Sequence, residues 1–145
     1  MENVTRITGG KMKKGEMLDK ALLIATNAHH GQFDKGGNPY ILHPIKVMHY
    51  LKTDDEELMC MALLHDVVED CNVTYIDLEK QGMSSRVIAA IKCLTKQRGQ
   101  SYEEYIDCMK DSEWALLIKR EDLRDNSDIT RMRGVSDKDI ERLRK

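Results

Sequence analysis

Four ionisable side chains fall within six residues of this chain, at His65, Asp66, Glu69 and Asp70. The apolar segment 58–64 precedes them at helical spacing, so we predict one helix that starts at Thr53-Asp54-Asp55 and continues through Asp70. In such a helix His65 lies under Glu69 and Asp66 under Asp70. A carboxylate directed into a core is costly unless it is paired, hydrogen-bonded or bound to a cation. The spacing therefore indicates a bound metal ion, and a solvated acidic helix end is the alternative.

Two further segments carry side chains of the same kind. His43 precedes Pro44, which fits the first turn of a helix, so His43 lies at a helix entrance. Asp122 shares one predicted helix face with Ile118, Asn126 and Ile129. Two imidazoles and two carboxylates suit Mn²⁺, Fe²⁺ or Mg²⁺ better than a thiol-loving ion. Spacing alone leaves open whether the segments meet, and solvated charges with satisfied core histidines are the alternative.

Composition bounds the class of protein. The 145 residues are 41% hydrophobic and 33% charged, which is typical of one soluble globular domain. The net charge of −2 does not indicate a nucleic-acid or membrane surface. The apolar segment 58–64 is too short to span a bilayer, and the N-terminus lacks the apolar core of a signal peptide. The cysteines form no C-x-x-C pair and indicate reduced thiols in a cytoplasmic protein; they are Cys60, Cys71, Cys93 and Cys108.

The elements that position these residues are all predicted to be helices. Only two prolines occur and no run is rich in β-branched residues, so we expect an all-α single-domain bundle of about seven helices. Residues 1–14 are predicted to be a flexible leader and residues 15–145 the domain. Helix starts are indicated at Thr74 with Asp77, Ser84 or Ser85, Ser101 with Glu104, and Ser136. The glycine-rich loop 32–38 is either a ligand-binding loop or a plain connector.

The order of His43, His65-Asp66 and Asp122 resembles that of the HD phosphohydrolase superfamily. The similarity is greater to one branch, the hydrolase domain of RelA/SpoT-type alarmone enzymes and their small stand-alone relatives. Five segments resemble the signatures of that branch in order and spacing, namely 28–32, 37–44, 62–70, 94–96 and 118–126. Together the resemblance covers roughly residues 15–132.

This resemblance implies an all-α domain of the HD type and a metal-dependent enzyme, often with manganese. The activity it implies is removal of pyrophosphate from the 3′ position of ppGpp or pppGpp. The residues that resemble the metal ligands are His43, His65, Asp66 and Asp122. Glu69 and Asp70 match the acidic pair that handles the attacking water. The candidate substrate-binding residues are Lys35, Asn126, Gln32 and Lys96, with Asn126 near the nucleotide sugar and Lys35 facing phosphate or base.

Two positions depart from the family pattern and keep alternatives open. Asp34 stands where these hydrolases usually carry an arginine that packs on guanine, which favours another 3′-modified nucleotide or a pyrophosphorylated RNA end. Glu121 stands where a small residue usually precedes Asp122, and it is either an extra acidic group near the metal or a surface residue. Glu121 also favours a catalytically silent, antitoxin-like module that binds a nucleotide. The expected partner is a small-molecule nucleotide, with an RNA 3′ end as the one nucleic-acid alternative and no membrane partner. Alarmone synthesis is not expected, and the sequence indicates no oligomeric state.

Overall fold

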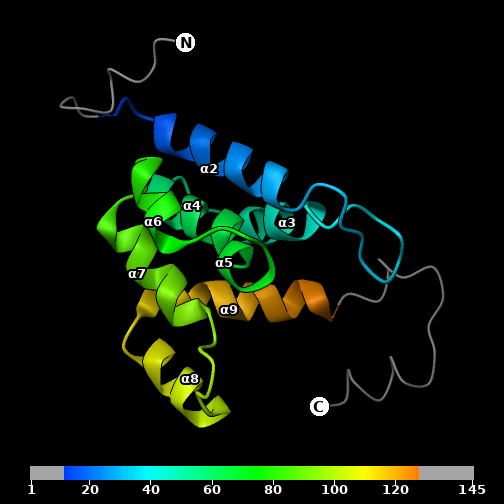
Figure 1. Cartoon of the computed structure of the whole chain (residues 1–145), viewed down its shortest axis with the longest axis vertical. Coiled ribbons are helices and arrows are strands. Elements are labelled where there is room, and N and C mark those ends of the chain that lie inside the picture. The colour runs from blue at the N-terminus through cyan, green and yellow to red at the C-terminus, as the bar shows by residue number, and fades with distance from the viewer. Residues whose placement is uncertain (1–11, 128–145) are drawn as a thin grey trace.

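The structure, a computed structural model, describes residues 12–127. Most of the predicted leader, Ile129 and the helix predicted from Ser136 lie outside the described residues. The described part forms eight helices, which confirms the all-α fold (Figure 1). They are α2 (Glu16–Ala28), α3 (Leu42–Tyr50), α4 (Glu56–Leu64), α5 (Val67–Asp70), α6 (Tyr75–Lys80), α7 (Ser85–Leu94), α8 (Tyr102–Lys110) and α9 (Glu113–Asn126). No helix within residues 12–127 is long and apolar enough to cross a membrane.

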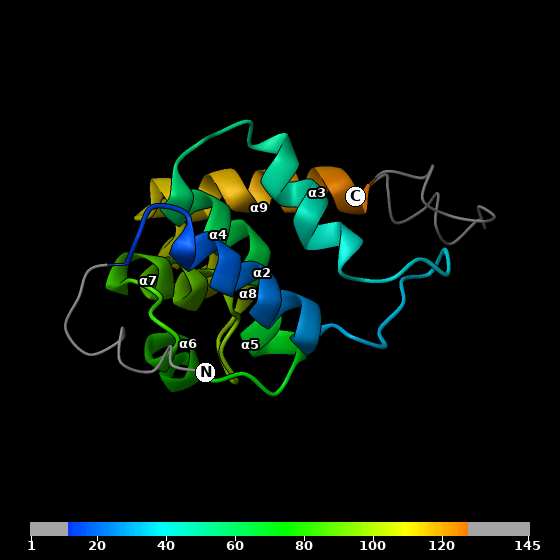
Figure 2. The ribbon, with the colours of Figure 1, turned by 90° about the horizontal axis from the view of Figure 1, so that it is seen from above.

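Helix α4 forms the centre of the bundle. Six of its nine residues are buried, from Leu58 to Leu64 with the exception of Met59. It packs against α2, α3 and α7, while α9 packs against α3, α7 and α8. In Figure 1, α3, α4 and α5 lie between α2 and α9, and Figure 2 shows α4 between α2 and α9 from above. The burial of apolar side chains around α4 is the main force that holds these helices together.

Side-chain caps define where most helices begin. Asp55 accepts a hydrogen bond from the Leu58 amide at the start of α4. The predicted capping boxes at Thr74–Asp77 and Ser101–Glu104 are both present, and each satisfies two otherwise unpaired backbone donors. Ser84 caps α7 and Ser112 caps α9 without a capping box, each accepting one hydrogen bond from a backbone amide. The helix starts predicted from the sequence are therefore confirmed for the described residues.

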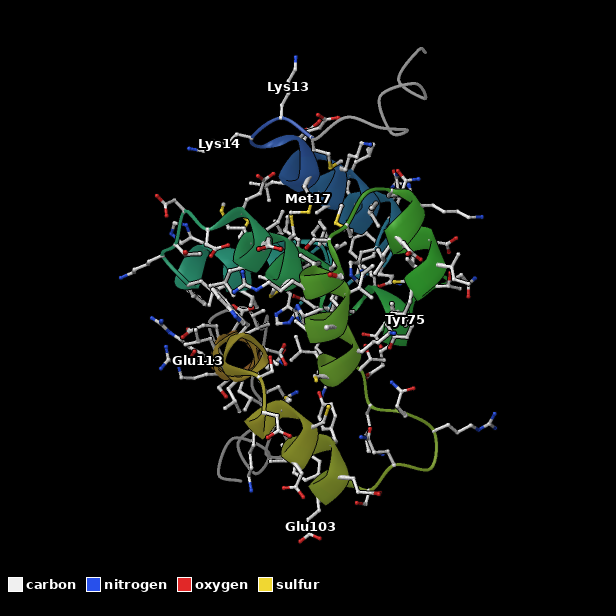
Figure 3. All side chains as sticks on the ribbon, turned by 90° about the vertical axis from the view of Figure 1, so that its left-hand side faces the viewer. Lys13, Lys14, Met17, Tyr75, Glu103 and Glu113 are labelled. Carbon is white, nitrogen blue, oxygen red and sulfur yellow. The ribbon has the colours of Figure 1, made fainter. Side chains whose placement is uncertain are left out.

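The start of α2 is fastened to α4 by a long-range contact. The Glu56 carboxylate accepts from the backbone amides of Gly15 and Leu18, at 3.1 and 3.0 Å. An acidic side chain is favourable there because the N-terminus of a helix carries a partial positive charge. In Figure 3 Lys13 and Lys14 point away from the helices, whereas Met17 packs against the core. Glu56 thus helps to place α2 across α4.

The prediction of one continuous central helix was wrong. The helix ends at Leu64, His65 and Asp66 form a turn, and α5 begins at Val67. Asp66 has φ −105° and ψ −9°, which departs from ideal α-helical values within the right-handed region. The turn brings the Asp66 carboxylate to the hydroxyl of Tyr40, and the His65 ring bonds back to the Ala62 carbonyl. The Asp70 amide still donates to the Asp66 carbonyl at 2.9 Å, so the interruption is confined to the turn between Leu64 and Val67.

Candidate metal centre

Four side chains from three parts of the fold meet at one point. His43 comes from α3, His65 and Asp66 from the turn between α4 and α5, and Asp122 from α9. One ligand atom from each lies within 4.8 Å of all the others. His43, His65 and Asp122 are buried, at 2%, 3% and 6% exposure, and Asp66 is half-buried. The structure therefore brings together the four residues that the sequence predicted as metal ligands.

The shortest distances in this group run between imidazole nitrogens and carboxylate oxygens. Asp122 Oδ1 lies 2.8 Å from His43 Nε2 and 3.2 Å from His65 Nε2. Asp66 Oδ2 lies 3.2 Å from His65 Nε2 and 3.8 Å from His43 Nε2. Both Nε2 atoms thus face both carboxylates.

The other nitrogen of each ring is hydrogen-bonded away from this point. His65 Nδ1 donates to the Ala62 carbonyl at 2.6 Å, and His43 Nδ1 donates to Asp125 Oδ2 at 2.7 Å. Since a carbonyl and a carboxylate only accept, each Nδ1 carries a proton. In a neutral imidazole this leaves a lone pair on Nε2, directed at the other ligand atoms. Metal-binding histidines have this arrangement, with one nitrogen on the ion and the other hydrogen-bonded to a carbonyl or carboxylate.

Electrostatics also favours a cation at this point. Burial by itself lowers the pKa of His65, but the carboxylates of Asp66 and Asp122 outweigh burial and raise that pKa well above 6.5. Burial by itself raises the pKa of Asp66 and of Asp122, yet their histidine partners outweigh it. The pKa of Asp66 falls to about 2, and that of Asp122 is also lowered. Without a metal, the raised pKa favours a proton on His65, whose Nε2 faces the carboxylates of Asp66 and Asp122. A divalent ion bound there would replace the positive charge of that proton.

Tyr40 supports Asp66 from the loop before α3. Its hydroxyl donates to Asp66 Oδ2 at 2.6 Å. Burial, together with the Asp66 carboxylate, raises the pKa of Tyr40 far above 10, so the phenol stays protonated and remains a donor. The Tyr40 ring also packs between those of His29 and His43, with centroids 4.8 and 5.5 Å away. Tyr40 thus orients a candidate ligand, a role not predicted from the sequence.

Asp125 is a second residue whose role was not predicted. It is fully buried in α9, three positions after Asp122, and accepts the hydrogen bond from His43. The signal in the sequence was its spacing, since residues three apart lie on the same side of a helix. Asp122 and Asp125 therefore hold the two ring nitrogens of His43 from a single helix.

Glu69 and Asp70 lie on the exposed side of α5, next to this group. Glu69 Oε1 accepts a hydrogen bond from the backbone amide of Lys96 at 3.0 Å. Partial burial, then the charges of Asp66 and Glu69, raise the pKa of Asp70. Asp70 also lines a cleft of about 650 Å³ between α2 and α6. Asp70 therefore lies within electrostatic reach of His65 and Asp66, while Glu69 is held by the segment that follows α7.

The predicted substrate-binding residues lie in different places. Asn126 donates to Asp122 Oδ1 at 3.3 Å and is therefore part of the centre. Gln32 lines the same cleft as Asp70 and bonds to His29 Nδ1 at 2.9 Å. Lys96 follows α7, where its backbone amide contacts Glu69. Lys35 is exposed in the loop between α2 and α3. Their roles toward a substrate remain predictions.

The two residues that depart from the family pattern have local structural partners. Asp34 Oδ1 accepts from the Asn38 amide at 2.9 Å, which closes the turn of its own loop. Glu121 is buried at 5% exposure and forms ion pairs with Arg120 at 3.0 Å and Arg124 at 3.3 Å. The expectation that Glu121 is a surface residue was wrong, and Glu121 is not one of the four converging residues. The two guanidinium groups compensate the charge of its buried carboxylate.

Lys119 lies beside the candidate ligands on α9. Its ammonium group is 3.2 Å from Asp122 Oδ2 and lies over the Tyr105 ring, 5.6 Å from the ring centroid. Burial by itself lowers the pKa of Lys119, but Asp122 outweighs burial and raises it. The lysine therefore stays charged next to the centre.

Comparison with known proteins agrees with this geometry. The HD domain family matches residues 21–133 of the chain. The bifunctional (p)ppGpp synthase/hydrolase SpoT of Escherichia coli K12 is 34% identical over 122 residues, which are 75% of this chain and 17% of that protein. A guanosine-3′,5′-bis(diphosphate) 3′-pyrophosphohydrolase of Vibrio cholerae is 44% identical over 72 residues, which are 48% of this chain and 10% of that protein. The chain thus spans less than a fifth of the length of either relative.

A solved structure is also similar. It comes from work on a metazoan ortholog of SpoT that hydrolyzes ppGpp. The TM-score is 0.72 at 25% sequence identity, and the match covers 92% of this chain and 82% of the other. The likeness therefore extends over nearly the whole domain.

Proposed function

The chain belongs to the HD domain family, and on that premise we propose that it is a metal-dependent hydrolase that removes pyrophosphate from the 3′ position of ppGpp or a closely related nucleotide. The observation that carries the proposal is the convergence of His43, His65, Asp66 and Asp122. The names of the relatives support the choice of substrate, since both curated relatives and the similar structure are described as acting on ppGpp.

We propose Mn²⁺ as the ion, with Fe²⁺ and Mg²⁺ as alternatives. Two imidazole nitrogens and two carboxylate oxygens suit such hard-to-borderline ions, and no thiol is among the converging atoms. A divalent ion held there polarises phosphoryl oxygens and lowers the pKa of coordinated water toward neutrality. His43, His65, Asp66 and Asp122 are the residues that would hold it.

Glu69 and Asp70 are proposed to act on the attacking water. The raised pKa of Asp70 makes its carboxylate a better proton acceptor near neutral pH than an ordinary aspartate. The hydrogen bond from the Lys96 amide holds the Glu69 carboxylate, which supports the proposal that Glu69 orients the water. Neither residue belongs to the converging group, so their role is distinct from metal binding.

Positive charge near the centre would stabilise the leaving pyrophosphate. Lys119 is held beside Asp122 and stays charged, so its ammonium group is already next to the proposed ligands. Lys35 and Lys96 are proposed to contact the phosphates from the α2–α3 loop and from the segment after α7. Asn126 contacts Asp122 from the last turn of α9 and is proposed to meet the nucleotide sugar.

A substrate panel tests the proposal. Manganese-loaded protein would be incubated with ppGpp, pppGpp, ppApp, NADPH and deoxynucleoside triphosphates, and the products separated by ion-exchange chromatography. We expect ppGpp to yield GDP and pyrophosphate, and Asp122→Asn to abolish this reaction. Glu113→Gln changes an acidic residue at the other end of α9 and should leave it intact. Binding of ppGpp without turnover would instead identify a silent nucleotide-binding module.

A further inference from the structure

Two thiols outside the metal centre lie side by side. Cys93 in α7 and Cys108 in α8 are 15 residues apart in the chain, and their sulfur atoms are 2.9 Å apart. Both residues are half-buried and both are reduced. We propose that Cys93 and Cys108 form a reversible disulfide that ties α7 to α8 next to Glu69. The pair is a modification site in addition to the proposed hydrolytic centre.

The geometry requires little movement for the bond to form. A disulfide has an S–S distance of about 2.05 Å, so the two sulfurs need to approach by about 0.9 Å. Cys93 Sγ also lies 3.7 Å from the backbone oxygen of Cys108, so the Cys93 side chain already faces α8. The other two cysteines are placed differently, because Cys60 is buried and Cys71 contacts Gln32 and His29. Cys93 and Cys108 are therefore the pair we expect to combine.

The chemistry balances with a peroxide as the oxidant. One thiol loses its proton and attacks a peroxide oxygen, which gives a sulfenic acid and one water. The second thiol attacks that sulfur, the S–S bond forms, and the sulfenic oxygen leaves as a second water. Two thiols are thereby oxidised by two electrons while hydrogen peroxide is reduced to two waters. A dithiol reductant reverses the bond by exchange.

The disulfide would reinforce a junction that supports the proposed catalytic pair. Leu94 follows Cys93, and its carbonyl accepts a hydrogen bond from the Tyr105 hydroxyl of α8 at 2.9 Å. Two residues later the Lys96 amide donates to Glu69. A covalent link between α7 and α8 closes a loop that contains this segment, and it restricts the motion of the segment that holds Glu69. The disulfide itself does not depend on the proposed function; only the catalytic role of Glu69 rests on it.

The test uses mass spectrometry and does not depend on turnover. The full chain would be treated with hydrogen peroxide and then digested without reductant, with alkylation of the remaining thiols. We expect a peptide pair joined through Cys93 and Cys108, a higher melting temperature, slower hydrogen exchange at residues 94–96, and reversal of all three by dithiothreitol. Cys71→Ser should leave the linked pair intact, whereas Cys93→Ser and Cys108→Ser should each abolish it.

A reagent that traps sulfenic acids shows whether the two cysteines react with each other. In Cys93→Ser the sulfenic acid at Cys108 has no partner, so a 1,3-diketone reagent should label Cys108 after peroxide treatment. The wild-type protein should show much less of this label because Cys93 consumes the sulfenic acid. The proposal is overturned if peroxide oxidises Cys71 while Cys93 and Cys108 remain separately alkylated. It is also overturned if the linked form shows unchanged exchange at residues 94–96. If the substrate panel shows no nucleotide hydrolysis, the linked peptide, the Cys108 label and the hydrogen exchange can still be measured, so the two proposals can fail separately.

Discussion

The His43 ring is held from both sides by α9: Asp125 Oδ2 accepts from Nδ1 at 2.7 Å, and Asp122 Oδ1 lies 2.8 Å from Nε2. The hydrogen bond from His43 to Asp125 joins residues 82 positions apart in the chain, and the Asp125 side chain is fully buried. It fixes the tautomer and the orientation of His43, so one helix sets both the proposed ligand Asp122 and the direction in which His43 presents Nε2.

We expect Asp125→Asn to weaken metal binding. The amide oxygen is a poorer acceptor for the Nδ1 proton, so His43 becomes a less basic and less well oriented ligand. The expected loss in Mn²⁺ affinity is about 10- to 100-fold, measured by isothermal titration calorimetry. Asp107→Asn, on the exposed face of α8, is the matched control and should leave the Mn²⁺ affinity unchanged. An affinity within twofold of wild type in Asp125→Asn would show that this hydrogen bond does not tune His43.

Glu69→Gln and Asp70→Asn should separate turnover from metal binding. Each removes a carboxylate that is proposed to act on water, so kcat for ppGpp should fall about 10²- to 10⁴-fold. Mn²⁺ affinity should stay close to that of the wild type, because neither residue belongs to the converging group. Glu79→Gln, an exposed site on α6, serves as the control. Wild-type activity in Glu69→Gln would mean that the water is activated in another way.

Metal-induced stabilisation should increase with pH. The folded-state pKa of His65 is raised, so the stability that its proton contributes to the metal-free protein is present below about pH 6.5. That contribution is lost as the pH rises through the higher folded pKa. A bound ion takes the place of the proton, so the difference in melting temperature between metal-loaded and metal-free protein should grow from pH 6 to pH 8. A constant difference over this range would contradict the raised pKa of His65.

Much of this site could be predicted because its residues interrupt apolar patterns. His65 and Asp66 follow a buried segment, His43 precedes a helix-starting proline, and Asp122 stands on the face of Ile118. The capping boxes were equally predictable, because a serine or threonine followed three residues later by an acidic residue makes a local pair of hydrogen bonds. Local chemistry and periodicity thus predicted most of the helix starts and the four candidate ligands, whereas the resemblance to the HD superfamily supplied the expectation that these four residues meet.

The remaining features depend on contacts across the fold. The break at His65 and Asp66 follows from partners such as Tyr40, which is 26 residues away from Asp66. Asp125 is buried because His43, from another helix, donates to it. The burial of Glu121 depends on how its arginine neighbours fold over it. Helical periodicity contains no information on such pairings.

Because Asp34 stands at the position of the base-stacking arginine, we expect the protein to discriminate weakly between guanine and adenine substrates. Aspartate cannot stack on a purine as a planar arginine does, so kcat/KM for ppGpp and ppApp should agree within about tenfold, roughly 1.4 kcal/mol. Asp34→Arg should improve the guanine substrate preferentially, although it removes the acceptor for the Asn38 amide. Asp34→Asn keeps an acceptor without the charge and is the matched control. A wild-type preference for ppGpp of a hundredfold or more would show that other residues read the base.

The central claim is that one divalent ion at His43, His65, Asp66 and Asp122 supports pyrophosphate release. The most direct test titrates metal-free protein with Mn²⁺ while bound ion and pyrophosphate release from ppGpp are measured on the same samples. Bound ion and released pyrophosphate should rise together and saturate at about one ion per chain, and Asp122→Asn should lose both. Pyrophosphate release by metal-free protein, or an ion bound at full occupancy with no release, would contradict it.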